Sequence, residues 1–279
     1  MGPVGWRVGS FGELIMGDFL APSFVITVSG SDASGSAGMQ ADNRAIHAMG
    51  AFPLNVVTAL TLQTDQGVQS IDLMAPELIR MHLVGLLNSY PVKVIKAGML
   101  GSGEIVQVLV DVLVQYPDVS LVLDPVLKAS SGRPLLDRGG IELLRKELLL
   151  RTLLITPNLP ELAELAGLGE MNSSEQEGEA AQILLKLGCQ AVLVKGGHRS
   201  GEAAIDRLFN HAGFVEFTSK KIVTQNTRGT GCALASLIAG GLANGLEMTV
   251  AVDLSKKKLS ASLDSQVDEI WPGRGPGFV

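Results

Sequence analysis

The chain has 279 residues, of which 46% are hydrophobic and 18% charged, and its net charge is −6. This composition describes a folded protein with a sizeable core, and the scattered Lys and Arg residues argue against a nucleic-acid partner. Two cysteines, Cys189 and Cys232, are too few for a disulfide framework or a Cys-based metal cluster and favour a reducing cytoplasm. No apolar run has the length of a membrane span, so we expect no membrane partner.

Short β-branched apolar runs alternate with helix-period segments along the chain. The runs are apolar throughout, as strands are when helices cover both faces of a sheet. This order predicts a doubly wound, mostly parallel α/β sheet in a single domain over residues 23–279, after a Gly-rich N-terminal extension over residues 1–22 that lacks signal-peptide features. The predicted strands are residues 24–29, 55–60, 92–98, 120–126, 153–156 and 191–196, and the predicted helices are residues 37–49, 76–89, 103–114, 140–149, 159–166 and 174–187.

The C-terminal third departs from strict alternation. Residues 203–210 and 213–222 are two strand-like runs separated by two residues, which predicts a β-hairpin. An apolar helix is then expected over residues 233–246. Ligands of such sheets bind at the carboxyl ends of the strands, and six loops with Gly, Pro or charged residues fall there. These loops are residues 30–38, 98–100, 124–125, 156–161, 195–197 and 229–232.

Gly229, Thr230, Gly231 and Cys232 stand where a loop turns into the last of these helices. Two glycines allow close approach of the backbone, and unpaired N–H groups with the helix dipole favour an anion. A cysteine in the same field is expected to have a lowered thiol pKa and could act as a base. The alternative is a simple turn followed by a small buried residue.

The first glycine cluster, residues 30–38, follows a strand and opens a helix. It matches neither a Rossmann fingerprint, since residue 28 is Val, nor a Walker A loop, since no Lys follows Gly35. Its three glycines favour a loop that holds a small polar substrate, and a tight strand–helix turn is the alternative.

Asp124, Asn158, Glu161 and Lys195 also follow predicted strands. Two carboxylates at strand ends suit a Mg²⁺ ion that carries nucleotide phosphates, and Lys195 could place a positive charge beside them. The alternative for Asn158 and Glu161 is purely structural, because an N-cap and its N3 glutamate form a capping box at a helix start.

Taken together and in order, these segments resemble the hydroxymethylpyrimidine/phosphomethylpyrimidine kinases of the ribokinase superfamily. The resemblance covers about nine-tenths of the chain and is carried by residues 25–32, 37–42, 58–63, 96–100, 123–126, 156–161, 194–198, 226–232 and 273–277. It implies a ribokinase-like three-layer α/β/α sandwich. Cysteine at residue 232, where most of the superfamily has aspartate, is typical of kinases for pyrimidines and of their pyridoxal-kinase-like relatives.

The resemblance implies a role for each site residue. The pyrimidine would be surrounded by Gly30, Ala37, Thr61, Gln63, Met99 and Val126. Asp124 and Glu161 would hold Mg²⁺, with Asn158, Lys195 and Thr230 at the ATP phosphates. The N–H groups of residues 229–232 would stabilise the moving phosphoryl group, and Cys232 would accept the proton of the substrate hydroxyl.

Three positions depart from the family pattern. Ser36 replaces a usual glycine, Arg228 stands where the family often has histidine, and Lys128 comes two positions earlier than the lysine of the corresponding loop. The lysine shift puts that loop's phosphate contacts in question, and Arg228 adds a permanent positive charge beside the anion site.

The expected function is ATP-dependent phosphorylation of 4-amino-5-hydroxymethyl-2-methylpyrimidine and then of its monophosphate, for thiamine biosynthesis. ATP and Mg²⁺ are the expected cofactors, with a monovalent cation as an open addition. A cytoplasmic homodimer is the expected state, with an organellar location as the alternative. A pyridoxal kinase on the same scaffold and a non-catalytic pyrimidine-binding protein are the alternatives.

Overall fold

The computed structural model describes residues 22–64, 67–129, 131–171, 173–197, 201–271 and 275–278. All of the predicted N-terminal extension except Pro22 lies outside these ranges. The single-domain boundary at residue 23 therefore stays a prediction.

A nine-stranded sheet in the order β3-β2-β1-β4-β5-β6-β7-β8-β9 runs through the described residues. The five pairings from β2 through β1, β4, β5 and β6 to β7 are parallel, whereas β3, β8 and β9 pair antiparallel with their neighbours. The strands are β1 (Phe24–Asp32), β2 (Phe52–Thr64), β3 (Gly67–Leu73), β4 (Val92–Ala97), β5 (Ser120–Leu123), β6 (Thr152–Ile155), β7 (Ala191–Val194), β8 (Ala203–Asn210) and β9 (Gly213–Lys220). The mostly parallel sheet confirms the predicted architecture.

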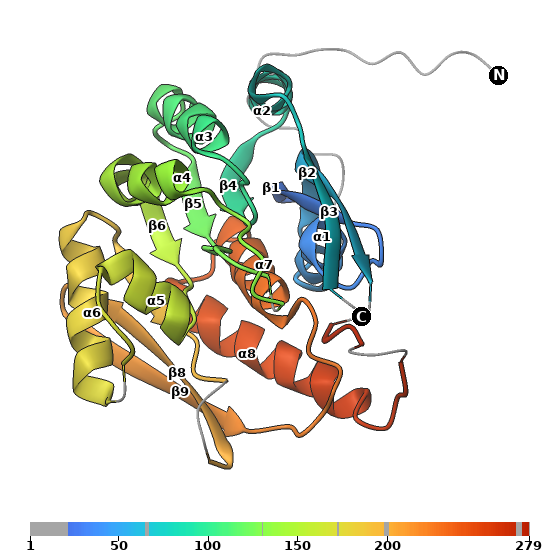
Figure 1. The fold of residues 1–279 in the computed structure, drawn as a ribbon, viewed down its shortest axis with the longest axis vertical. Coiled ribbons are helices and arrows are strands. Elements are labelled where there is room, and N and C mark those ends of the chain that lie inside the picture. Colours follow the sequence, from blue (N-terminus) through green and yellow to red (C-terminus); the bar gives the residue numbers. More distant parts are fainter. Residues whose placement is uncertain are drawn as a thin grey trace, which may run out of the picture.

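Helices cover both faces of the sheet (Figure 1). The helices are α1 (Gly38–Ala48), α2 (Pro76–Ser89), α3 (Gly103–Gln115), α4 (Arg138–Leu143), α5 (Leu159–Ala166), α6 (Ser174–Lys186), α7 (Thr230–Ala243) and α8 (Met248–Ser265), and α4 continues into a π-helical turn (Leu144–Leu148) and a 3-10 turn (Leu149–Arg151). Helices α2 to α6 lie on one side, and α1, α7 and α8 lie on the other.

Each face of the sheet has its own hydrophobic core. Along β1, Val25 packs into the core under α1, α7 and α8, whereas Ile26 and Val28 pack into the core under α2 to α6. Val94 and Ile95 of β4 divide between the two cores in the same way. Because successive strand residues point to opposite faces, a strand buried on both sides is mostly apolar along its length, with few exceptions such as the buried Thr27 and Lys96. This is why the strand sequences do not alternate in polarity.

The structure adds two elements to those predicted and moves several element boundaries, including the start of α7. β3 pairs with an extended β2, and α8 follows α7; neither β3 nor α8 was expected. Helix α7 begins at Thr230, three residues before the predicted start, which places the Gly-Thr-Gly-Cys segment within the first turn. Among the described residues no helix is both long and apolar enough to cross a membrane.

Candidate active site

A cavity of about 630 Å³ opens at the carboxyl ends of the parallel strands. Backbone hydrogen bonds continue past these strand ends and align the loops: Gly98 N–H donates to the Val28 carbonyl (2.9 Å) and Asp124 N–H to the Ala97 carbonyl (2.8 Å). Every predicted site residue lines this cavity: Gly30, Ala37, Thr61, Gln63, Met99, Asp124, Val126, Asn158, Glu161, Lys195, Gly229, Thr230, Gly231 and Cys232. The six loops therefore form one site, as the topology predicted.

The start of α7 is held between two walls of this cavity. Gly229 has a φ of +71°, and a side chain there would overlap the Ser36 carbonyl oxygen in the first glycine loop. A Cβ at Gly231 would lie 3.1 Å from Lys195 Nζ on the opposite side. The glycines thus let the first-turn N–H groups, which have no intrahelical acceptor, face a ligand from between the two walls.

Cys232 is half-buried in this first turn, and burial raises the pKa of its thiol to about 12. The Lys96 ammonium and the Gly38 backbone N–H favour the thiolate, while the carboxylates of Asp124 and Asp42 oppose it. The prediction of a lowered pKa was therefore wrong for the free protein, because loss of solvation outweighs the favourable charges.

Lys195 and Asp124 form an ion pair at the centre of the site. Lys195 Nζ lies 2.8 Å from Asp124 Oδ1. Burial alone would raise the pKa of Asp124, but the ammonium groups of Lys195 and Lys96 outweigh it and keep that pKa below its usual range. Asp124 is therefore a carboxylate at neutral pH, with one oxygen engaged by Lys195.

Asn158 and Glu161 form the capping box that the sequence left as an alternative. Asn158 Oδ1 accepts from the Glu161 N–H and Glu161 Oε2 accepts from the Asn158 N–H, each at 2.9 Å. The cap fixes the Glu161 side chain toward the cavity instead of excluding it from the site. Burial raises the pKa of Glu161 to about 7, and the nearby Asp124 adds to this effect while Lys195 opposes it.

The carboxylates of Asp124 and Glu161 suit a magnesium ion that is shared with substrate phosphates better than a metal ion held by protein ligands alone. Among the described residues no group of three or more His, Cys, Asp or Glu side chains could hold a metal. Mg²⁺ is commonly bound by one or two carboxylates together with substrate phosphates and water. The raised pKa of Glu161 beside Asp124 also indicates a place where a cation would relieve repulsion between acids.

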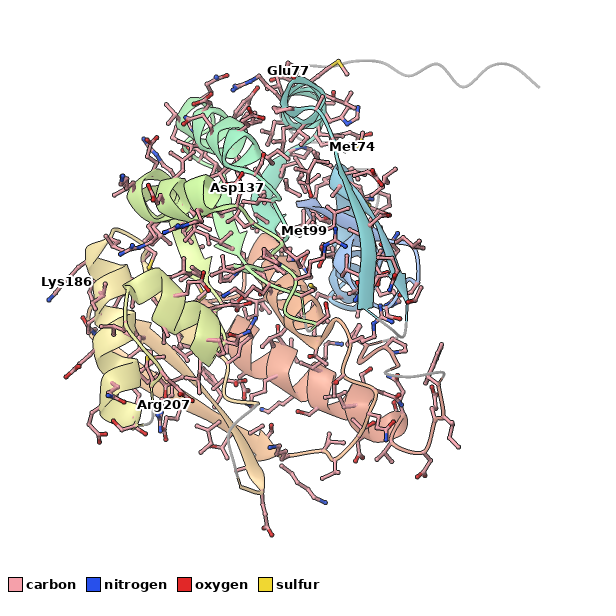
Figure 2. All side chains as sticks on the ribbon, viewed as in Figure 1. Met74, Glu77, Met99, Asp137, Lys186 and Arg207 are labelled. Atoms are coloured by element: carbon pink, nitrogen blue, oxygen red, sulfur yellow. The ribbon has the colours of Figure 1, made fainter. Side chains whose placement is uncertain are left out.

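A further side of the cavity, next to β2 and β3, is mostly apolar. Met99, Leu135 and Ala59 form a small buried cluster with Val126 at its edge, and Figure 2 shows Met99 in the interior of the molecule. Met99 is held by Thr58 Oγ1, which donates to its carbonyl (2.6 Å). Thr61 and Gln63 place polar groups beside this surface. An aromatic ring with polar edges would fit such a wall.

Two charged groups of the site were assigned no role from sequence. Asp32 accepts from Ser34 N–H (3.0 Å) and Ala37 N–H (2.9 Å) and so shapes the first glycine loop. Its signal was an acidic residue within the glycine cluster that follows the first predicted strand. Lys96 pairs with Asp42 in the core behind Cys232, and a single lysine inside an apolar strand gave no such signal. Lys128, the lysine that comes two positions earlier than in the family pattern, lines the cavity but pairs with Glu164 (2.8 Å).

Comparison with known proteins agrees with this geometry. The family model for phosphomethylpyrimidine kinase matches residues 32–277. The chain belongs to this kinase family. The hydroxymethylpyrimidine/phosphomethylpyrimidine kinase of Escherichia coli K12 is 38% identical over 254 residues, which are 91% of this chain and 95% of that protein. The thiamine biosynthesis bifunctional protein of Geobacter sulfurreducens is also 38% identical, but the chain spans only 51% of its length.

Solved structures show the same ribokinase-like fold. The phosphomethylpyrimidine kinase of Clostridium difficile 630 superposes with a TM-score of 0.75 at 34% identity, covering 85% of this chain and 98% of that one. The pyridoxal kinase of Staphylococcus aureus, in complex with AMP-PCP and pyridoxal, gives a TM-score of 0.82 at 29% identity and covers 92% and 93% of the two chains. Both solved structures are kinases, and the second contains AMP-PCP, an analogue of ATP.

Proposed function

We propose that this kinase phosphorylates 4-amino-5-hydroxymethyl-2-methylpyrimidine with ATP and then converts the monophosphate into the diphosphate, for thiamine biosynthesis. The observation that carries the proposal is the position of the α7 start, between a lysine–carboxylate wall and an apolar pocket with polar edges. Phosphoryl transfer requires an anion site between a donor and an acceptor, and this arrangement supplies one. The names of the related kinases support the choice of acceptor.

The residues of the donor side would act mainly through charge and position. Lys195 would turn from Asp124 to the ATP phosphates, with Asn158 and Thr230 beside them. Asp124 and Glu161 would hold Mg²⁺, which neutralises phosphate charge when bound. The first-turn N–H groups of α7 would donate to the oxygens of the phosphoryl group in transit, where fixed dipoles are most effective.

On the acceptor side, Cys232 would take the proton of the hydroxymethyl group as its oxygen attacks phosphorus. Cys232 acts as the thiolate, after its own proton has passed to solvent. The O–H bond of the acceptor breaks, its proton passes to Sγ, the new O–P bond forms, and the bond between the transferred phosphorus and ADP breaks as ADP leaves. Lys96 and the Gly38 N–H are the groups that favour the thiolate this step requires. Since the thiol is protonated in the free protein, we expect positioning and charge to contribute more than the base.

The test is a coupled ADP-release assay with the pyrimidine alcohol, its monophosphate and pyridoxal as acceptors. We expect Cys232→Ala to lower kcat about 100-fold or more with little change in substrate Kd, as for loss of a general base. Cys189→Ala is the matched control, because Cys189 is buried beside Leu184 and does not line the cavity. Unchanged turnover of Cys232→Ala would remove it from the base role.

Pyridoxal phosphorylation is the second candidate. It is favoured by the fold similarity to pyridoxal kinase in complex with pyridoxal, and the ring and hydroxymethyl arm of the two acceptors are alike. The two activities are separated by kcat/KM for the two acceptors in the same assay. A higher kcat/KM for pyridoxal would reverse the assignment.

We further propose a cytoplasmic homodimer that forms through the outer face of β2 and β3. Leu60 and Leu62, two residues apart on β2, point to the same face of the strand pair, and each is about half exposed there. Such an apolar patch favours a protein contact. Light scattering coupled to size exclusion should give a dimer mass that Leu62→Asp reduces to the monomer. The unpaired state of both cysteines supports a reducing compartment.

A further inference from the structure

Two cationic side chains flank the start of α7 on opposite sides. Lys195, from the end of β7, lies beside Gly231 on the side of Asp124. Arg228 directly precedes Gly229 and reaches the ends of β1 and β2: its Nη2 lies 3.7 Å from Asp32 Oδ2, and its Nη1 lies 3.5 Å from the Thr64 carbonyl oxygen. Arg228 therefore stands on the acceptor side of the anion site.

The Arg228 guanidinium is poorly satisfied in its present position. Its side chain is 11% exposed and lines the cavity, yet Nε and Nη2 have no hydrogen-bond partner among the described residues. Asp32 is too distant for a hydrogen bond, and its oxygens already accept from Ser34 and Ala37. A buried donor without an acceptor is unfavourable, because it has lost its hydrogen bonds to water without replacement. The 3.5 Å contact with Thr64 is also long, so little holds the guanidinium in this orientation.

The backbone of Arg228, in contrast, is fixed. Its N–H donates to the Gly275 carbonyl (3.0 Å), and its carbonyl accepts from the Gly277 N–H (2.8 Å). The C-terminal segment thus anchors the main chain beside the anion site and leaves the long side chain to turn. Nε and Nη2 form one edge of the guanidinium, the fork that binds two oxygens of one phosphate.

We propose that Arg228 binds the phosphate of the monophosphate acceptor and so makes the second phosphorylation the preferred one. The inference rests on the proposed function. The alcohol acceptor is neutral and brings no partner for this charge, whereas a phosphate monoester brings nearly two negative charges and three acceptor oxygens. The ATP phosphates are served by Lys195 on the opposite wall. Arg228 is therefore a specificity-determining residue for the phosphorylated acceptor.

The experiment compares kcat/KM for the monophosphate with kcat/KM for the alcohol in the full chain. Arg228→Gln should lower the ratio of the two about 10- to 100-fold, as expected for loss of a hydrogen-bonded charge pair. Arg228→Lys, which keeps the charge but not the fork, should give an intermediate ratio. Arg44→Gln is the matched control: its guanidinium also interacts with Asp32, but it does not line the cavity, so the ratio should not move.

Calorimetry without ATP provides a second measurement. The wild-type protein should bind the monophosphate more tightly than the alcohol, and Arg228→Gln and Arg228→Lys should each reduce that difference. An unmoved ratio and an unmoved binding difference in both variants would overturn the role of Arg228 while leaving the kinase assignment intact. If the wild-type protein turns over neither pyrimidine, the proposed function fails, and the inference fails with it.

Discussion

Two lysine–carboxylate pairs lie close to Cys232 and differ mainly in what can reach them. Lys96 Nζ is 2.7 Å from Asp42 Oδ1, and neither side chain is exposed at all. Lys195 Nζ is 2.8 Å from Asp124 Oδ1, but 15% of the lysine side chain is exposed to the cavity. The two pairs have the same chemistry and nearly the same length. Their functions nevertheless separate.

The sealed pair connects four elements. Asp42 of α1 accepts from Lys96 of β4, from Ser29 of β1 (2.7 Å) and from Ser236 of α7 (2.8 Å). Neither Lys96 nor Asp42 lines the cavity, so this pair anchors α1 and α7 to the sheet. The open pair has an alternative for each partner: an incoming phosphate for Lys195 and a cation for Asp124. A buried ion pair acts as a scaffold when closed off and as a ligand site when it faces a cavity.

The largest effect is expected from breaking the sealed pair. Lys96→Met leaves the Asp42 carboxylate buried without its cation, which should lower the free energy of unfolding by about 3–5 kcal/mol. Urea denaturation measures this change. Lys257→Met is the control, because Lys257 pairs with Asp253 on the exposed face of α8 and should change stability by less than about 0.5 kcal/mol. Equal losses in the two variants would contradict the scaffold role.

Breaking the open pair should affect activity more than stability. In Lys195→Met, water can enter the cavity and Lys96 remains near Asp124, so we expect a loss below about 2 kcal/mol, less than for a sealed pair. The value of kcat/KM should fall about 100- to 1,000-fold, as when a preorganised charge is removed from a transition state. The comparison of the two pairs would be wrong if Lys195→Met unfolded as readily as Lys96→Met.

Glycines beside the two lysines sharpen the comparison. A Cβ at Gly98 would lie 2.9 Å from Lys96 Nζ, and one at Gly231 would lie 3.1 Å from Lys195 Nζ. Lys96 has no room to yield, so Gly98→Ala should cost about 1–3 kcal/mol of stability through overpacking. Lys195 can shift into the cavity, and alanine favours the helix, so Gly231→Ala should keep its stability within about 1 kcal/mol. Thermal unfolding and kcat/KM of both variants test the contrast. Gly231→Ala is expected to lower kcat/KM while its stability is kept, whereas Gly98→Ala is expected to lower stability.

The same contrast explains what could be predicted from the sequence. Residues of the open site lie in loops after strands, where glycines, prolines and charges interrupt apolar runs, and topology gathers those loops at one edge. All the predicted site residues accordingly line one cavity. The sealed pair gave no such pattern, because Asp42 lies within a helix and Lys96 within a strand, and only packing brings them together.

Other differences have similar causes. The lowered pKa expected for Cys232 followed from its place at a helix start, but the degree of burial that reverses it depends on long-range packing. Helix α8 was not recognised since its buried positions include Ser255 and Lys256, which obscure an apolar stripe. Strand β3 is a half-exposed edge strand with Gln69 and Asp72, and its polarity masked it. Local pattern thus predicted the elements with continuous apolar faces and missed those whose pairing is set by neighbours.

The smallest effects are expected from the hydroxyl groups that donate to each carboxylate. Ser236 Oγ donates to Asp42 Oδ1 at 2.8 Å within the sealed core, whereas Thr156 Oγ1 lies 3.4 Å from Asp124 Oδ1. Ser236→Ala removes a short bond to a buried charge and should cost about 1.5 kcal/mol, while Thr156→Val removes a long one and should cost less than about 1 kcal/mol. Thr156→Val should lower kcat/KM more than Ser236→Ala does, since Asp124 but not Asp42 is proposed to take part in the reaction. If Ser236→Ala lowered kcat/KM more than Thr156→Val at equal folded fraction, the sealed pair would have a direct part in catalysis and the division between scaffold and ligand site would not hold.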